Sequence, residues 1–302
     1  MEYMELPKID EEQPKDKPHI FGVARNAYVS VMQEMRPQTI LVSGESGAGK
    51  TETTKFVMRY LALAGHHGAE GLMSDVEREV LQSIPLLEAL GNAKTIRNDN
   101  SSRFGKYMEL QFGRPPGSEA TFSAAPRLVG AQIRTYLLEK VRVDCQQEGE
   151  RSYHVFYQLL AAADRELSRN PSLNGNVCVD GIELPGVAGF KPSDFTYLRQ
   201  SNCVSLGQHV DEAEHFDRTL AALRSFGISD EEVADIFRAI AGVLHLGSIA
   251  FAAPRNNSEG SRPMGGESDA IASVCEILAV DPEELTVAMC TRAIRAPGQR
   301  AI

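Results

Sequence analysis

Residues 44–51 have the types and spacing of a phosphate-binding loop. They read Gly-Glu-Ser-Gly-Ala-Gly-Lys-Thr, so two glycines five positions apart are followed by lysine and a hydroxyl residue. Glycines let the backbone bend sharply and turn successive N–H groups towards a phosphate. Lysine can reach the β- and γ-phosphates, and the hydroxyl suits Mg²⁺. The residues assigned to this loop are Gly44, Glu45, Ser46, Gly47, Ala48, Gly49, Lys50 and Thr51.

Such a loop needs a strand before it and a helix after it. Residues 39–42, which follow Pro37, form a short run of apolar and β-branched residues. Such a run predicts a buried strand. After Lys50, apolar residues recur at helical spacing, and Gly65 stands where a helix would end. The positive end of this helix dipole would face the phosphates. Strand, glycine turn and helix therefore occur in the required order.

A second polar segment, residues 98–106, lies downstream and is predicted to be a loop. Phosphoryl transfer needs a second Mg²⁺ ligand, donors to the γ-phosphate and a group that places a water molecule. Asn98, Ser101 and Ser102 could fill these roles, and Arg103 could form an ion pair or stabilise charge. Taken alone, the segment could equally be a polar turn.

Several segments of the chain, taken in order, resemble the myosin motor head. The first three are residues 44–52, residues 88–95 and residues 98–106. Further similar segments are residues 136–140, 149–151, 153–160 and 194–198. The resemblance runs from Pro18 to about Ile294, and several separate motifs in family order make it specific.

The resemblance implies a ligand and roles for the first loop. Residues 44–51 would hold ATP, with Lys50 on its β- and γ-phosphates. Thr51 and Ser102 would ligate Mg²⁺. ATP and Mg²⁺ are therefore the expected ligands, and actin filaments are the expected partner of the full head.

By the same resemblance, residues 98–103 would be switch I. Asn98 would bond phosphate oxygens, and Ser101 would lie over the γ-phosphate near the attacking water. Arg103 would pair with a glutamate of switch II. The expected catalytic residues are therefore Lys50, Asn98, Ser101 and Arg103.

Switch II of the family reads roughly Asp-Ile-x-Gly-Phe-Glu, and we do not find it in this chain. Residues 187–191 contain Gly-Phe but lack the leading acid and have Lys191 in place of glutamate. They also precede Asp194, which is too early in family order. Val141 stands where the family usually has serine. The lower actin-binding subdomain, the converter and the light-chain-binding helix are not recognised either, so we expect a partial head that binds no light chains.

We expect an α/β fold, with a P-loop NTPase core in which a mixed central sheet is flanked by helices, plus a mainly helical subdomain. Residues 18–145 would form the nucleotide-binding core and residues 146–302 the helical, upper-50-kDa-like part. Residues 1–17 are acidic and contain prolines, which predicts a poorly ordered end.

Periodicity and cap residues predict the other elements. Strands are expected from alternation, with Met108, Leu110 and Phe112 on one face of residues 107–112, and Val129 to Leu137 as another strand. Helices are expected at residues 20–35 and 151–163. A third helix is expected to begin after the capping box of Ser229 and Glu232 and to end at Gly247, and a fourth is expected to begin after Asp281. Loops are expected at residues 65–74, at 170–191 as a long insertion, and at 254–267.

The composition limits the class of protein. The 302 residues are 42% hydrophobic, which is enough for one large or two smaller cores. A net charge of −10 argues against a nucleic-acid binder, which would need a basic surface. Five cysteines without paired metal spacing indicate free thiols in a reduced compartment. No signal peptide or membrane-spanning run is recognised, so a cytoplasmic, cytoskeleton-associated myosin complex is the expected location.

Two alternatives remain beside an actin-based motor. One is a module that binds nucleotide but is catalytically impaired, because a whole switch and its ion pair are not found. The other is a different P-loop NTPase, such as a kinesin-like motor or a small-molecule kinase. Kinesins usually have Ser-His where Phe104 and Gly105 stand, and Gln-Thr where Glu45 and Ser46 stand.

Overall fold

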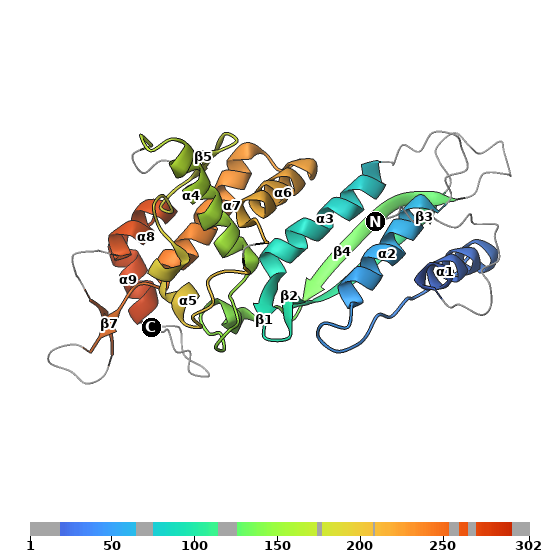
Figure 1. Cartoon of the computed structure of the whole chain (residues 1–302), viewed down its shortest axis with the longest axis horizontal. Coiled ribbons are helices and arrows are strands. Elements are labelled where there is room, and N and C mark those ends of the chain that lie inside the picture. Colours follow the sequence, from blue (N-terminus) through green and yellow to red (C-terminus); the bar gives the residue numbers. More distant parts are fainter. Residues whose placement is uncertain are drawn as a thin grey trace, which may run out of the picture. The chain divides into compact units, whose positions relative to one another are not determined.

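The structure of the chain is a computed structural model (Figure 1). It describes residues 19–64, 75–113, 126–173, 177–207, 209–253, 260–264 and 270–291. The chain divides into two compact units, an N-terminal unit (Met1–Glu139) and a C-terminal unit (Lys140–Ile302). The expectations for residues 1–17 and 65–74, and most of those for 254–267, fall outside the described residues.

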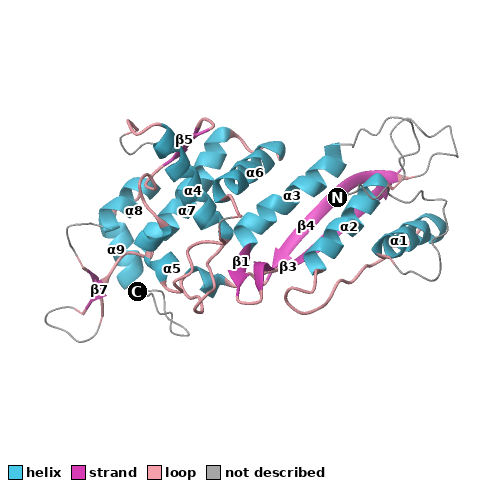
Figure 2. Cartoon of the chain, viewed as in Figure 1, coloured by secondary structure: helices cyan, strands magenta, loops and turns pink. Residues whose placement is uncertain are grey.

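The N-terminal unit combines three helices with two separate hairpins among its described residues (Figure 2). Both hairpins are antiparallel and two-stranded, so the predicted mixed central sheet is not seen in this part of the chain. The elements are α1 (Ile20–Glu34), α2 (Lys50–Leu63), α3 (Asp75–Gly91), β1 (Asn92–Thr95), β2 (Asn98–Ser102), β3 (Gly105–Gly113) and β4 (Arg127–Tyr136).

The strand predicted at residues 39–42 is wrong, because these residues form no strand with any described residue. A strand is stable only when its backbone N–H and C=O groups pair with a neighbouring strand. The β3–β4 hairpin does not pair with this segment. Leu41 is consequently 86% exposed, while Ile40 packs at the edge of the α1–α2 cluster.

Helix α2 lies between two apolar clusters and holds the N-terminal unit together. One row of its side chains, including Val57 and Tyr60, packs on Phe21 and Tyr28 of α1. This confirms the helix predicted from residue 20 and the row that contains Tyr28. Other α2 residues, Met58 among them, pack in a second cluster with residues of α3 and β4.

A β-bulge decides which face of β4 is buried. In the middle of the hairpin the pairing is regular, and Met108 lies opposite Ile133. The register shifts after Gln111, so that Phe112 lies opposite Leu128 and Val129 becomes an extra residue. Leu128 is therefore 2% exposed and Val129 44% exposed. The predicted face of β3 is confirmed, whereas the alternation predicted through Val129 fails at that end of β4.

The C-terminal unit is mainly helical in its described part, as the residue pattern predicts. Helix α4 packs on α6, and α7 packs on α8 and on the β5–β6 hairpin (Figure 1). The helices are η1 (Lys140–Val143), α4 (His154–Arg169), η2 (Pro192–Asp194), α5 (Thr196–Arg199), α6 (Glu212–Ser225), α7 (Asp230–Leu246), α8 (Ala270–Leu278) and α9 (Pro282–Cys290). The strands are β5 (Val177–Val179), β6 (Ile182–Leu184), β7 (Phe251–Ala252) and β8 (Arg262–Pro263).

The long insertion predicted at residues 170–191 is instead an integral part of this core. Strands β5 and β6 form a hairpin whose inward residues are all buried. Its turn contains Asp180 and Gly181, both with positive φ (48° and 84°), which is the geometry that Asp-Gly turns favour. Asp-Gly between two alternating apolar runs is a hairpin signal, and the Asn, Gly and Pro content of the whole segment obscured it.

The predicted caps of α7 and α9 are confirmed, whereas the helix predicted at residues 151–163 instead runs from His154 to Arg169. Ser229 and Glu232 form a reciprocal capping box at the start of α7, and Gly247 caps its end. The Asp281 side chain accepts hydrogen bonds from the backbone N–H groups of Glu283 and Glu284 at the start of α9. Within the described ranges, no helix has the length and apolar character needed to cross a membrane. The five cysteines are free thiols.

Candidate nucleotide-binding site

The glycine loop opens at the N-terminus of α2. Gly47 and Gly49 have φ values of 83° and 80°, a left-handed conformation that a residue with a Cβ adopts only under strain. Gly49 is the residue before the helix, and no side chain caps the helix there. The first N–H groups of a helix lack partners within the helix. The N-terminus of α2 therefore presents backbone donors and a positive dipole end to an external anion.

Lys50 lies across its own loop. Its Nζ donates hydrogen bonds to the carbonyl oxygens of Gly44, at 2.6 Å, and of Glu45, at 2.7 Å. These contacts bend the loop around the ammonium group. A phosphate oxygen that replaced either carbonyl oxygen would accept a hydrogen bond from the same Lys50 ammonium group.

The β1–β2 hairpin brings the second predicted segment to this loop. The Oγ atoms of Ser46 and Ser101 lie 3.4 Å apart. On the same side, a Cβ built on Gly47 would lie 3.5 Å from the carbonyl oxygen of Arg97, in the hairpin turn. Ser101 is only 4% exposed. Two polar segments that lie 55 positions apart along the chain are thus in contact.

The segment predicted as a loop is a strand from Asn98 to Ser102, and this corrects the prediction. It pairs with β1, which supplies the backbone partners that make a strand stable. Successive side chains of a strand point to opposite faces. Ser101 therefore faces the glycine loop, whereas Ser102 is exposed and its Oγ donates to the carbonyl oxygen of Phe104 at 3.2 Å.

The other predicted ligand residues make no described contact with each other. The Asn98 side chain bonds within its own hairpin, where its Oδ1 accepts from the backbone N–H of Asn100 at 3.0 Å. Thr51 lies in the first turn of α2 and is partly exposed. The roles of Asn98 on phosphate, and of Thr51 and Ser102 on Mg²⁺, stay predictions. Among the described residues, no cluster of three His, Cys, Asp or Glu side chains could hold a metal ion.

Arg103 has an acidic partner that the sequence pattern did not reveal. Its Nε lies 2.6 Å from Oε2 of Glu139, and its Nη1 donates to Oγ of Ser101 at 3.2 Å. Glu139 belongs to one of the segments that resemble the myosin head, but 36 positions separate it from Arg103. No local pattern links residues so far apart, and the partner was expected only in switch II.

Ion pairs of Lys55 link helix α2 to helix α3. Lys55 lies 2.9 Å from both Glu52 and Glu88. Burial acts to lower the pKa of Lys55, but its hydrogen bonds to Glu52 and Glu88 outweigh this and leave the pKa raised. Burial lowers the pKa of Lys106, and the nearby Glu88 carboxylate opposes that shift only in part. Lys55 thus acts as a structural ion-pair partner in α2.

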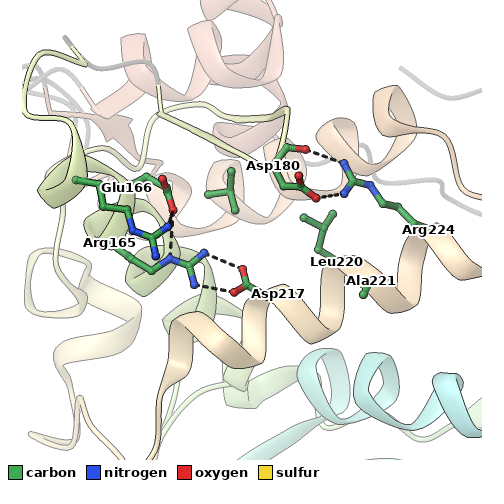
Figure 3. A pocket seen from close by; sticks show the side chains of 9 residues that line it. Arg165, Glu166, Asp180, Asp217, Leu220, Ala221 and Arg224 are labelled. Carbon is green, nitrogen blue, oxygen red and sulfur yellow. Dashed lines mark hydrogen bonds and ion pairs between the residues drawn. The ribbon is translucent and has the colours of Figure 1, made fainter.

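A polar pocket in the C-terminal unit is a poor alternative for a phosphate ligand (Figure 3). It has a volume of about 410 Å³ and lies among residues of α4, α6 and the β5–β6 turn. Two nitrogens of Arg165 each lie 2.7 Å from an oxygen of Asp217, and Arg224 pairs with Asp180. Arg169, which also lines the pocket, pairs with Glu166. Since each of these guanidinium groups already faces a carboxylate, the described residues that line the pocket offer no uncommitted cation for phosphate.

The chain is similar to known proteins along nearly all of its length. A model of the "Myosin head (motor domain)" family matches residues 8–301. The chain belongs to the myosin head family. This myosin head segment is 44% identical over 276 residues to Myosin-7 of Arabidopsis thaliana, covering 91% of the chain and 14% of that relative. It is 39% identical to unconventional myosin-Vb of Homo sapiens, covering 91% of the chain and 13% of the relative.

A relative from a third lineage gives the same result. Myosin-I heavy chain of Dictyostelium discoideum is 36% identical over 285 residues, covering 94% of the chain and 11% of the relative. The myosin head segment therefore spans between 11% and 14% of the length of these three relatives. Membership of the family implies an α/β fold of the P-loop NTPase type and nucleotide binding.

Proposed function

We propose that this chain is the ATP-binding part of an actin-based cytoskeletal motor, in which ATP hydrolysis by the full head drives movement along actin filaments. The observation that carries the proposal is the contact between Ser46 of the glycine loop and Ser101 of the β1–β2 hairpin, at the open N-terminus of α2. Donors from two segments converge there on the place where a triphosphate would lie.

In this proposal residues 44–51 hold the phosphates. The backbone N–H groups at the start of α2 would bind phosphate oxygens, and Lys50 would move from the carbonyls of Gly44 and Glu45 to the β- and γ-phosphates. Thr51 would supply a hydroxyl ligand to Mg²⁺. The metal, when bound, would neutralise charge on the phosphate oxygens.

The hairpin residues would act on the terminal phosphate. Ser101 faces the loop and would donate to the γ-phosphate, and Arg103 would stabilise that arrangement. Asn98 and Ser102 would have to leave their present hydrogen bonds, to Asn100 and Phe104, to reach phosphate and Mg²⁺. Both side chains lie at or near the protein surface, so these rotations need no repacking of a core.

Residues 18–145 would form the nucleotide core, and residues 146–302 would belong to the upper-50-kDa-like part of the head. The expected setting is a cytoplasmic myosin complex on the actin cytoskeleton. The family comparisons do not favour the alternatives, a catalytically impaired binding module or a kinesin-like motor.

Equilibrium binding of a fluorescent ATP analogue tests the nucleotide site. With Mg²⁺ present we expect saturable binding to the 302-residue chain, weakened when EDTA removes the metal. Circular dichroism establishes that the sample is folded, and Lys50→Ala serves as the site control. A folded chain that binds no nucleotide in Mg²⁺ would contradict the proposal.

Co-sedimentation with filamentous actin tests the partner separately. Actin should pull down the chain, and Mg-ATP should reduce the amount bound, because nucleotide and actin are coupled ligands of the same motor. Bovine serum albumin serves as the unrelated control. Actin binding that is the same with and without nucleotide would separate the two activities and contradict a motor function.

A further inference from the structure

Arg103 is held through its backbone on both sides. Its N–H donates to the carbonyl oxygen of Gly91 at 2.9 Å, at the end of α3. Its own carbonyl oxygen accepts from the backbone N–H of Glu139 at 3.0 Å. The start of the side chain therefore has a fixed position between the end of a helix and the segment that follows β4.

The guanidinium of Arg103 connects two side chains from different segments. Its Nε bonds Glu139 at 2.6 Å, and its Nη1 bonds Ser101 at 3.2 Å. A guanidinium is planar, and its N–H groups point in fixed directions. When Glu139 holds Nε, the direction of Nη1 is also set. The Glu139 carboxylate therefore aims Arg103 at the Ser101 hydroxyl.

That contact determines what the Ser101 hydroxyl can do. A serine hydroxyl has one proton to donate and two lone pairs that accept. Because Arg103 donates to this oxygen, the serine proton is left to point elsewhere. Another polar atom near this hydroxyl is Oγ of Ser46, at 3.4 Å, in the glycine loop. Ser101 is 4% exposed, so the hydroxyl has few other orientations.

We propose that Glu139 is a positioning residue for the triphosphate: through Arg103 it keeps the Ser101 hydroxyl turned as a donor towards the glycine loop, where the terminal phosphate would lie. The inference rests on the proposed nucleotide site. It assigns to Glu139 a role in discriminating a triphosphate from a diphosphate, because only the triphosphate places an acceptor next to Ser101.

The experiment compares two ligands on Glu139→Gln, which keeps the size of the side chain and removes its charge. A non-hydrolysable ATP analogue and ADP, each with Mg²⁺, are titrated into the 302-residue chain. We expect the affinity for the analogue to fall about 3- to 10-fold, a loss typical of one weakened charge-assisted hydrogen bond, and that for ADP to change less than about 2-fold. A merely structural role would weaken both ligands equally.

A double-mutant cycle tests the route through Ser101. Ser101→Ala alone should weaken the analogue to a similar extent, and adding Glu139→Gln to it should cause no further loss. Asp217→Asn is the matched control, since it removes a carboxylate that pairs with an arginine in the C-terminal unit, Arg165. It should leave both affinities unchanged.

The failures of the two proposals are distinguishable. If the unaltered chain binds neither ligand, the nucleotide site itself is wrong. If it binds the analogue and Glu139→Gln binds it equally well, or if the losses of Glu139→Gln and Ser101→Ala add, the positioning role is overturned. Should Glu139→Gln not fold, Arg103→Lys keeps the charge but loses the planar fork, and must show the same loss confined to the triphosphate.

Discussion

The two units of the chain bury their side chains to different degrees. In the C-terminal unit, large residues such as Tyr157, Phe216 and Phe237 are almost fully enclosed. In the N-terminal unit, Leu41 and Leu137 are 86% and 85% exposed, and the strands form only two-stranded hairpins among the described residues. Hairpins of two strands are marginally stable unless something packs on them.

Stability and ligand chemistry place different demands on a protein segment. A helix satisfies its backbone hydrogen bonds internally, so the C-terminal unit needs only to cover apolar faces. The N-terminal unit leaves a glycine loop and a helix N-terminus open, and open polar groups can be satisfied by a ligand. We therefore expect substitutions of buried residues to change stability, and substitutions at the glycine loop to change ligand affinity.

The largest expected effect is at Arg151, which is completely buried in the C-terminal unit. Its Nη1 lies 2.6 Å from Glu212, and its guanidinium lies 3.6 Å from the centre of the Tyr157 ring. Arg151→Met leaves the Glu212 carboxylate without this partner, which should cost about 3–5 kcal/mol of unfolding free energy. Urea unfolding followed by circular dichroism measures it.

The matched control for this prediction is Arg218→Met. Arg218 pairs with Glu214 one turn away on α6, but both side chains are more than half exposed. Exposed pairs of this kind contribute about 0.5 kcal/mol or less. Equal losses in the two variants would show that the C-terminal unit does not depend on its buried ion pair.

The next largest loss of stability is expected at one of two neighbouring residues at the bulge of β4. Leu128 is 2% exposed and packs with Met58 and Val80, whereas Val129 is 44% exposed. Leu128→Ala should cost about 2–5 kcal/mol, because it leaves a cavity in the core. Val129→Ala should stay within about 0.5 kcal/mol, as is usual for surface positions. Thermal unfolding of both variants compares them, and a larger loss at Val129 would refute the bulged register of β3 and β4.

At the glycine loop the effect should appear in binding. Lys50→Ala removes an ammonium that contacts only the carbonyl oxygens of Gly44 and Glu45 in the described contacts. Loss of its charge-assisted bonds should weaken Mg-ATP analogue binding about 10- to 100-fold, while the midpoint of thermal unfolding stays unchanged. Lys94→Ala, in the nearby hairpin, is the control cation. Unfolding of the Lys50 variant would show that the loop serves stability instead.

The smallest expected effect is at the capping box of α7. Ser229→Ala removes the side-chain acceptor for the Glu232 N–H and should cost about 1 kcal/mol of unfolding free energy, measured by urea unfolding.

Hydrogen bonds from the Ser229 N–H and hydroxyl lower the pKa of Glu232. A lowered pKa means that this stabilisation is present above the pKa of the unfolded chain and is lost as pH falls through the folded pKa. Glu232→Gln should therefore be less stable than the unaltered chain at pH 7, and this difference should shrink as the pH falls through the folded pKa of Glu232; a difference that persisted unchanged in strong acid would contradict this.

Features that depend on residues a few positions apart can be predicted from the amino-acid sequence alone. The glycine loop at the start of α2, the capping box of α7 and the apolar face of β3 all follow from local spacing. The same local signals, repeated in family order, were sufficient to predict the myosin family, which the comparisons confirm. The Asp-Gly turn of β5–β6 depends on equally local residues, but the Asn, Gly and Pro residues around it indicate a loop.

Features that depend on a partner far away along the chain are established only by folding. Residues 39–42 are apolar and β-branched, but they are no strand, because a strand exists only beside another strand. The bulge that exposes Val129 depends on its pairing with β3, and the bond of Arg103 to Glu139 spans 36 positions. Local propensity limits each segment to a few conformations, whereas the partner that completes its hydrogen bonds and buries its side chains is chosen only when the chain has folded.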